Sequence, residues 1–191
     1  MKQIKTCVAL LLAAVLALSL AACAGKAGKT NDSLKARFSK LYESDTLAEM
    51  LADPAQHESE IAAYGLDDFA GTFKSADAFR SYTVEISVQN LNDFDVQVMN
   101  LQMKTENQGK NGVWFSVLNE GPVMGLPAQY TGDEALYYYA IADASLSREE
   151  VLQRLGEMGI SCVYVKGSEA PDADAQIDPS MLYTCEVLYE G

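Results

Sequence analysis

The stretch Tyr82–Met103, YTVEISVQNLNDFDVQVMNLQM, decides the fold class. Its first half carries an apolar side chain at every second position, at Tyr82, Val84, Ile86 and Val88. This alternation is typical of a β-strand with one buried face. Residues 90–93, NLND, have the composition of a turn, and the alternation resumes at Phe94 before its phase slips near Met99, as at a β-bulge. We expect two strands that are linked as a hairpin.

Further strands are expected towards the C-terminus, over residues 113–118, 135–142, 160–165 and 182–189. One helix interrupts them. Ser147 with Glu150 is the sequence of a capping box, apolar residues follow at helical spacing, and Gly159 is placed to end the helix.

The connection made by this helix has two interpretations. It is either a parallel βαβ crossover or a connection across the end of a sandwich, from one sheet to the other. We favour the second, because the first three strands look linked as hairpins and each has one apolar face.

Residues 32–70 are expected to be helical. The apolar residues between Leu34 and Leu51 follow a partly helical spacing, which is broken near Ser44–Thr46, and Gly65 is placed to end a second helical stretch. The fold class is therefore mainly β: an antiparallel β-sandwich over residues 71–191, with helical N-terminal segments and one helix between two late strands.

The stretch 82–103 resembles the first hairpin of the Ig-like domains that are common in bacterial surface lipoproteins of unknown function. Those hairpins have a strand, a turn rich in asparagine, and a second strand with Phe or Val entering the core. The resemblance extends over Gly71–Gly191. It implies an Ig-like β-sandwich and no catalytic residues.

The N-terminus has the features of an export signal. Lys2 and Lys5 precede an apolar run over residues 7–18, which is shorter than the roughly 20 residues of a membrane-spanning helix. Leu20-Ala21-Ala22-Cys23 then resembles the lipobox of bacterial lipoproteins. The alternative is an ordinary secretory signal with a chance cysteine.

The lipobox resemblance implies that residues 1–22 are removed and that Cys23 becomes a lipidated N-terminus, carrying diacylglycerol and an acyl chain such as palmitate. Residues 23–31 would then be a lipidated flexible tether, because they are small and polar. The expected location is the extracytoplasmic face of the cell membrane, in a cell envelope of unspecified type.

Net charge limits the partners. Loss of residues 1–22 removes two lysines and no acid, so the formal charge changes from -13 to -15. A chain this acidic is repelled by nucleic acid and by anionic lipid headgroups. We therefore expect no nucleic-acid partner, and a membrane contact made by the lipid.

Cys162 and Cys185 are the two cysteines left once Cys23 is lipidated. If the two last strands form an antiparallel hairpin around the loop 166–180, these cysteines lie opposite one another, within reach of a disulfide. The alternative is a pair of buried free thiols.

The acidic loop PDADAQID offers Asp172, Asp174 and Asp178 as weak metal candidates. It departs from a calcium loop, because Gln176 and Ile177 stand where a third ligand and a glycine are needed. A solvated loop is the preferred interpretation, so no metal and no cofactor other than the lipid is expected.

Aromatic residues offer possible contacts. In the row Tyr137-Tyr138-Tyr139 the middle ring should face away from its two neighbours. Trp114 and Tyr138 are the candidates for exposed aromatic contacts to a sugar or a protein. The alternative is that both pack in the core.

No catalytic residue is expected, because the chain has one histidine, His57, and neither a nucleophile elbow nor an HExxH motif. We expect a lipid-anchored extracytoplasmic binding or accessory module with a protein or glycan partner. One alternative is an envelope enzyme or solute-binding subunit that uses scattered carboxylates, and a second is a purely structural envelope protein.

Overall fold

The computed structural model describes residues 29–30, 33–45, 47–118, 123–169 and 178–190. The expected signal peptide, Cys23, Asp172 and Asp174 lie outside these ranges. No helix among the described residues is long and apolar enough to cross a membrane.

The fold is mainly β, as expected, with 43% of residues in strands and 22% in helices. The strands are β1 Lys29–Thr30, β2 Leu34–Glu43, β3 Phe79–Asn90, β4 Val96–Gln102, β5 Val113–Phe115, β6 Met124–Leu126, β7 Tyr130–Asp143, β8 Ser161–Lys166 and β9 Tyr183–Tyr189. The helices are α2 Ala48–Ala52, α3 Glu58–Ala63, α4 Asp67–Ala70 and α5 Arg148–Glu157, with short 3₁₀ turns η1 Ala76–Ala78, η2 Thr105–Asn107 and η3 Pro179–Met181.

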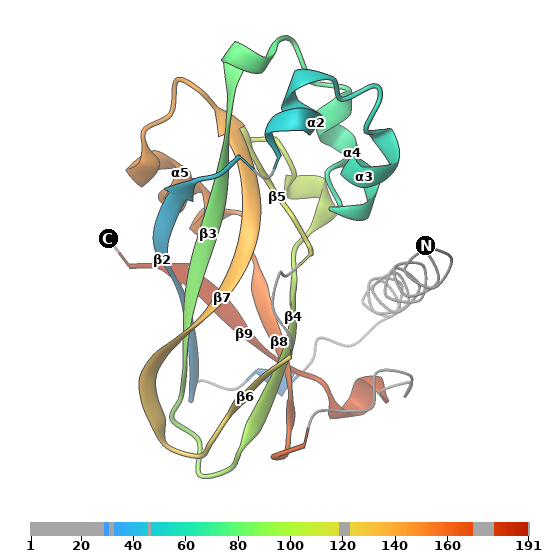
Figure 1. Ribbon diagram of the computed structural model, residues 1–191. Coiled ribbons are helices and arrows are strands. Elements are labelled where there is room, and N and C mark those ends of the chain that lie inside the picture. Colours follow the sequence, from blue (N-terminus) through green and yellow to red (C-terminus); the bar gives the residue numbers. More distant parts are fainter. Residues whose placement is uncertain (1–28, 31–32, 46, 119–122, 170–177, 191) are drawn as a thin grey trace.

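One sheet with the strand order β5-β7-β3-β2-β9-β8-β4-β6 curls on itself (Figure 1). The front layer is β5, β7, β3 and β2, and the rear layer is β9, β8, β4 and β6. The parallel pair β2/β9 joins the two layers, and β1 extends the edge of β9 beside Tyr183 and Thr184. Side chains of both layers meet in one core, so the curled sheet is sandwich-like.

The structure corrects the expectation of a helix from Asp32 onwards, because residues 34–43 form strand β2. Leu34, Ala36 and Phe38 alternate into the core, a bulge follows between Phe38 and Lys40, and Leu41 is the next buried residue. The bulge moves the apolar phase by one residue. Positions 34, 38 and 41 therefore acquire a helix-like spacing although the backbone is extended.

The hairpin expected within residues 82–103 is also wrong. Both strands exist, but β3 pairs with β2 and β7 whereas β4 pairs with β6 and β8. The connection crosses from the front to the rear layer. The fully buried side chain of Asn90 holds this connection in place. Its Nδ2 donates to the carbonyls of Phe94, Leu126 and Pro127.

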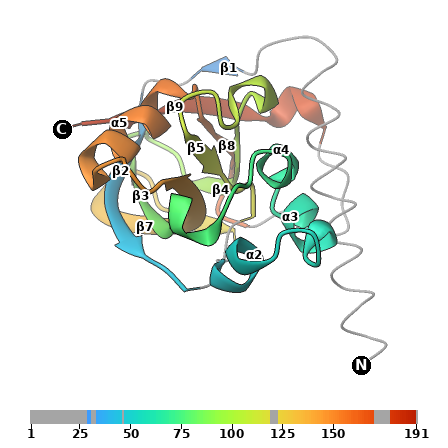
Figure 2. The same cartoon turned by 90° about the horizontal axis from the view of Figure 1, so that it is seen from above.

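The connection through α5 is confirmed as a crossing between layers. The capping box of Ser147 and Glu150 is present, and Gly159 has φ +70°, the left-handed conformation that suits glycine. Val151 and Leu155 of the helix are buried in the main core, so α5 closes one end of the sandwich (Figure 2).

Helices α2, α3 and α4 together with η1 form a helical cap on the outer face of the front layer (Figures 1 and 2). Apolar side chains of the cap, among them Leu47, Ile61 and Phe69, form a second core with Trp114 of β5 and Ile141 of β7. The helices expected in this region therefore exist, beginning only at residue 48. Gln108 fastens the cap, because its Nε2 donates to the Gly65 carbonyl at 2.9 Å and to the Phe115 carbonyl.

Candidate binding face

Three exposed apolar side chains lie on one side of the sheet. Tyr42 of β2 is 43% exposed, Tyr137 of β7 is 41% exposed and Leu188 of β9 is 50% exposed. All three point away from the main core, because their strand neighbours Leu41, Tyr138 and Val187 point into it. We call this surface, the outer face of β9, β2, β3 and β7 beside the cap, the tyrosine face.

Strand register places the side chains of the tyrosine face. Lys40, Glu85 and Tyr137 stand opposite one another on β2, β3 and β7. Tyr42 stands one row further towards the cap, opposite Thr83. Strand spacing puts the two tyrosines roughly 12 Å apart, with Glu85 between them.

Glu85 is the centre of a hydrogen-bond network. Its Oε1 accepts from Ser39 Oγ at 2.8 Å and lies 3.3 Å from Lys40 Nζ, and its Oε2 accepts from the Tyr42 hydroxyl at 3.0 Å. The β2 bulge supplies this geometry, since it lets Ser39 and Lys40 reach the same carboxylate. The network therefore holds Tyr42 at one side of the face.

The pKa of Glu85 reflects two opposing effects. Burial acts to raise it, and the hydrogen bonds from Ser39, Tyr42 and Lys40 outweigh burial, so the pKa lies below its ordinary value. The same contact raises the pKa of the Tyr42 hydroxyl. Glu85 is consequently an ionised acceptor near neutral pH rather than a proton donor.

Exposed ion pairs border the face on its other side. Arg37 contacts Asp133 at 3.3 Å and Glu190 at 3.1 Å, and Gln89 Nε2 donates to Asp133 at 3.1 Å. Pairs this exposed contribute little to stability. They give the face a polar rim around its aromatic groups.

The structure corrects the predicted aromatic contacts. Trp114 is only 3% exposed and packs against Phe69 and Phe79 of the second core, and Tyr138 is fully buried with its ring stacked on Phe115. The predicted alternation of the three tyrosines is confirmed, because Tyr138 enters the main core and Tyr139 the second. Tyr137 is the ring of the three that faces solvent.

Sequence reasoning missed Tyr42, Glu85 and Leu188. Tyr42 lay in a stretch expected to be helical, and Glu85 was one of many polar residues on a strand. A signal was present in the alternation Leu34-Lys35-Ala36-Arg37-Phe38, which would have placed Tyr42 on a strand.

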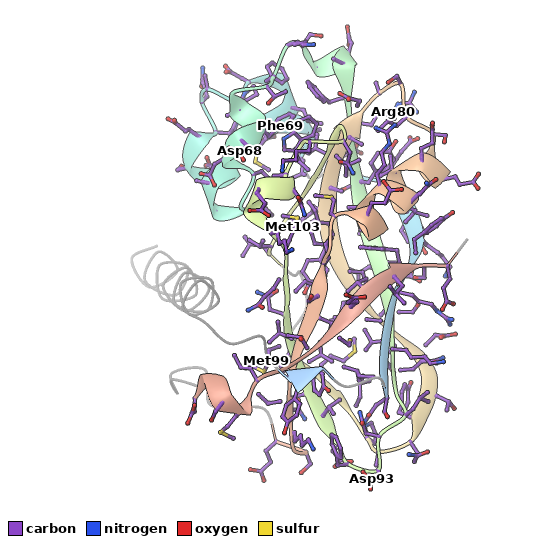
Figure 3. The ribbon with its side chains drawn as sticks, turned by 180° about the vertical axis from the view of Figure 1, so that it is seen from behind. Asp68, Phe69, Arg80, Asp93, Met99 and Met103 are labelled. Atoms are coloured by element: carbon purple, nitrogen blue, oxygen red, sulfur yellow. The ribbon has the colours of Figure 1, made fainter. Side chains whose placement is uncertain are left out.

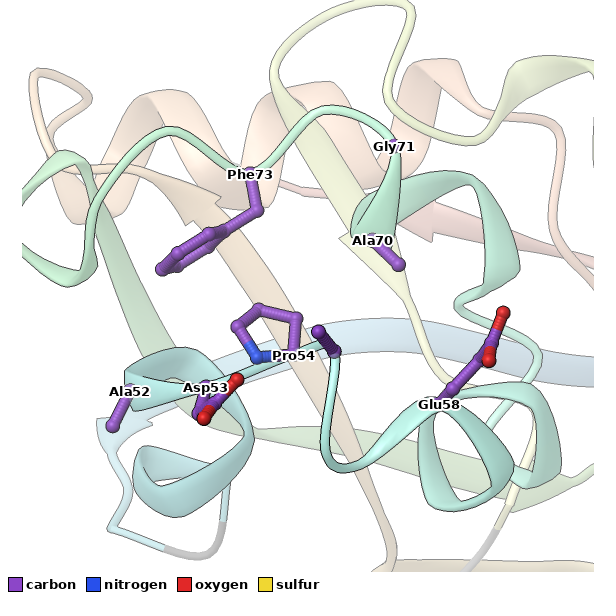
Figure 4. Close-up of a pocket in the computed structure, with 8 residues that line it drawn as sticks. Ala52, Asp53, Pro54, Glu58, Ala70, Gly71 and Phe73 are labelled. Atoms are coloured by element: carbon purple, nitrogen blue, oxygen red, sulfur yellow. The ribbon is translucent and has the colours of Figure 1, made fainter.

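A separate hollow lies in the helical cap (Figure 4). Pro54 and Phe73 form its apolar wall, Asp53 and Glu58 contribute carboxylates, and its volume is about 480 Å³. The hollow shares no residue with the tyrosine face.

Of the predicted metal candidates, Asp172 and Asp174 lie outside the described residues. Asp178, the one described member of the three, accepts a hydrogen bond from the Ser180 amide at 2.8 Å. Within the described ranges no three His, Cys, Asp or Glu side chains gather as a metal site. His57 lies at the start of α3, 3.9 Å from Glu60.

The antiparallel pairing of β8 with β9 is confirmed, and it sets Cys162 directly opposite Cys185. The Val187 amide donates to the Ile160 carbonyl at 2.8 Å, so Ile160 and Val187 form a hydrogen-bonded pair. Cys162 and Cys185 lie two residues further along their strands, and because the two types of pair alternate they also form a hydrogen-bonded pair. Cα atoms of such a pair are about 5.5 Å apart, within the range of a disulfide. The structure holds both as buried free thiols.

We propose that Cys162 and Cys185 become oxidised in the envelope. The two thiols would lose two protons and two electrons to an external disulfide, which leaves as a dithiol. A hydrogen bond with Cys185 and burial raise the pKa of the Cys162 thiol, and a protonated thiol is a poor nucleophile. Oxidation is therefore expected before β8 and β9 are packed. The envelope protein is alkylated under denaturing conditions with and without prior reduction. Prior reduction should raise its intact mass by the alkyl groups added to Cys162 and Cys185; an unchanged mass would reject the bond.

Comparisons with known proteins give little. No protein-family model and no curated protein matches the chain. Among solved structures, the cupredoxin domain of amoB from Nitrosocaldus yellowstonii is similar at 12% sequence identity and a TM-score of 0.31, over 85% of this chain and 90% of that one. A similarity at this level assigns neither fold family nor ligand.

Proposed function

We propose that the protein is a lipid-anchored extracytoplasmic binding module whose tyrosine face contacts a macromolecular partner. The observation that carries the proposal is the pair of half-exposed rings, Tyr42 and Tyr137, on either side of the hydrogen-bonded Glu85. Rigid aromatic side chains beside hydrogen-bonding groups are common at the centres of interfaces. The partner is a protein or a glycan.

Rigidity supports this assignment. The hydroxyl of Tyr42 is restrained by its hydrogen bond to Glu85. Tyr139, two residues after Tyr137 on β7, packs edge-on against Tyr64 of the cap, with the ring centroids 5.7 Å apart. Side chains that are ordered before binding lose less entropy when a partner arrives. The open sheet surface suits an extended ligand that lies across several strands.

The anchoring half of the proposal depends on the lipobox-like sequence at Cys23. Lipid chains contribute about 0.8 kcal/mol for each buried CH₂, so two or more chains hold a protein firmly on a membrane. We further propose that the sandwich is related to the Ig-like domains that the stretch 82–103 resembles.

The alternative of an envelope enzyme receives less support. A carboxylic acid that acts as a proton donor usually needs a raised pKa, whereas the pKa of Glu85 is lowered. A purely structural role would leave the exposed Tyr42 ring, restrained by Glu85, without a use.

Replacing Cys23 with Ser is expected to abolish incorporation of labelled fatty acid, because the thiol is the proposed acceptor of the lipid. Labelling is measured on intact cells after immunoprecipitation, and Cys162→Ser is the control that should label normally. Undiminished labelling of the Cys23→Ser protein would contradict the anchor.

The contact face can be located by photo-crosslinking on intact cells. A photoreactive phenylalanine analogue at position 137 should give discrete adducts with a partner. The same analogue at Glu149, on the exposed side of α5, serves as the control. Equal adducts from both positions, or none from position 137, would count against the proposal.

A further inference from the structure

We infer that the domain sits on the membrane with the corner between β3 and β4 nearest the lipid and with the helical cap at the far end. This inference rests on the proposed lipidation of Cys23. It assigns a membrane-facing surface, which we call the corner end, comprising residues 91–95, 127–129, 166–169 and 178–182.

The position of β1 fixes which end is anchored. Lys29 and Thr30 pair with Tyr183 and Thr184, at the start of β9. Tyr183, at the start of β9, pairs with Tyr164 near the end of β8. Lys166, the last residue of β8, pairs with Val96 at the start of β4. The first described residues are therefore at the corner end, where Figure 3 shows Asp93.

The reach of the tether is short. Six peptide steps separate Cys23 from Lys29, and a fully extended chain covers at most about 21 Å in that distance. Strand β3 runs from Asn90 at the corner end to Phe79 beside the cap, eleven steps of about 3.3 Å, or roughly 36 Å. The corner end is thus held close to the lipid while the cap can stand well away from it.

Charge decides between an upright and a lying domain. Residues 45–78, which form the cap, contain eight acidic residues and one lysine, for a net charge of -7. Among the described residues of the corner end, Asp93, Asp95, Glu169 and Asp178 are set against Lys166, for a net charge of -3. Anionic headgroups therefore repel the cap more strongly than the corner end, within the screening length of the solution.

The positive charge of the tether favours the same orientation, because the tether carries Lys26 and Lys29 and has no acid before Asp32. An upright domain presents the tyrosine face sideways, with Glu85 about 17 Å above the Asn90 row. A partner could then reach the face without displacing lipid, and the hollow at Pro54 and Phe73 would face away from the cell.

The test measures how close each end comes to a bilayer. The full-length lipidated chain, as Asp93→Cys or as Asp68→Cys, is labelled with a fluorophore and placed in phosphatidylcholine–phosphatidylglycerol vesicles that contain headgroup spin-labelled lipid. Both substitutions remove one exposed acid, one from the corner end and one from α4 (Figure 3). Unsubstituted protein controls for labelling of the buried Cys162 and Cys185.

Quenching at the Asp93→Cys site is expected to exceed that at the Asp68→Cys site at least twofold, and the difference should shrink in phosphatidylcholine alone. Equal quenching or stronger quenching at Asp68→Cys would overturn the orientation. Flotation with the vesicles separates the two claims: protein that fails to float contradicts the lipid anchor itself, whereas floating protein with reversed quenching contradicts the orientation alone.

Discussion

Replacing Asn90 with Asp is expected to lower the free energy of unfolding by about 3 to 5 kcal/mol, although the two side chains have nearly the same size. Asn90 Nδ2 lies 2.9, 3.2 and 2.8 Å from the carbonyl oxygens of Phe94, Leu126 and Pro127. A carboxylate would aim negative charge at three acceptors in a site without solvent access.

Asn90→Ala separates lost hydrogen bonds from the added charge. It removes the donor to the same carbonyls and the acceptor of two hydrogen bonds from Asn92, which should cost about 2 to 3 kcal/mol. Urea denaturation measures both variants. Gln56→Glu, the same chemical change at an exposed position, should stay within about 0.5 kcal/mol of the wild type. An Asn90→Asp protein that is no less stable than Asn90→Ala would contradict this account of the corner.

Replacing Glu85 with Ala should cost about 2 kcal/mol, since Ser39 and Tyr42 lose a charged acceptor. Lys40 is mostly exposed and adds little to that value. Glu149→Ala, at an exposed carboxylate on α5, is the matched control and should change stability by less than about 0.5 kcal/mol.

The pH dependence of the Glu85 contribution has a definite sign. The pKa of Glu85 is lower in the folded than in the unfolded chain, so its stabilisation is complete above the unfolded value and is lost as pH falls through the folded value. The stability difference between wild type and Glu85→Gln should therefore narrow below about pH 4.5. A difference that stays constant from neutral to acid pH would show that the carboxylate network does not contribute.

Local patterns predicted much of the fold. The alternation around Val84 and Ile86, the capping box at Ser147 and the opposition of Cys162 and Cys185 each depend on residues close in sequence or on one simple pairing. Patterns of this kind survive in the folded state, because they reflect which face of an element is buried.

Partner choice between strands could not be predicted. Tyr82–Asn90 and Val96–Gln102 each alternate as strands, but nothing in their own sequence says that they pair with β7 and β8 rather than with one another. The three carbonyls that Asn90 contacts come from residues 94, 126 and 127, so its role depends on the folded sheet order. The residues NLND taken alone therefore predict a hairpin turn, whereas in the folded sheet they form a corner between layers.

The candidate face could not be predicted for the same reason, because its exposure depends on contacts between distant parts of the chain. Burial of Trp114 depends on the cap that covers it, and exposure of Tyr137 depends on where that cap ends. Glu85 acquires its partners only because the bulge at Ser39 brings β2 residues onto one carboxylate. Such contacts join distant parts of the chain and have no local signature.

The central claim is that the tyrosine face binds a partner, and its most direct measurement is the yield of a crosslinked adduct on intact cells. A photoreactive side chain replaces Leu188, the third exposed apolar residue of the face. The yield is compared between the otherwise unchanged chain and Tyr42→Ala/Tyr137→Ala. Loss of two aromatic contacts should reduce the adduct at least about tenfold, whereas Glu149→Ala/Gln153→Ala on α5 should leave it unchanged. An adduct that forms equally well without the two tyrosine rings would contradict the account.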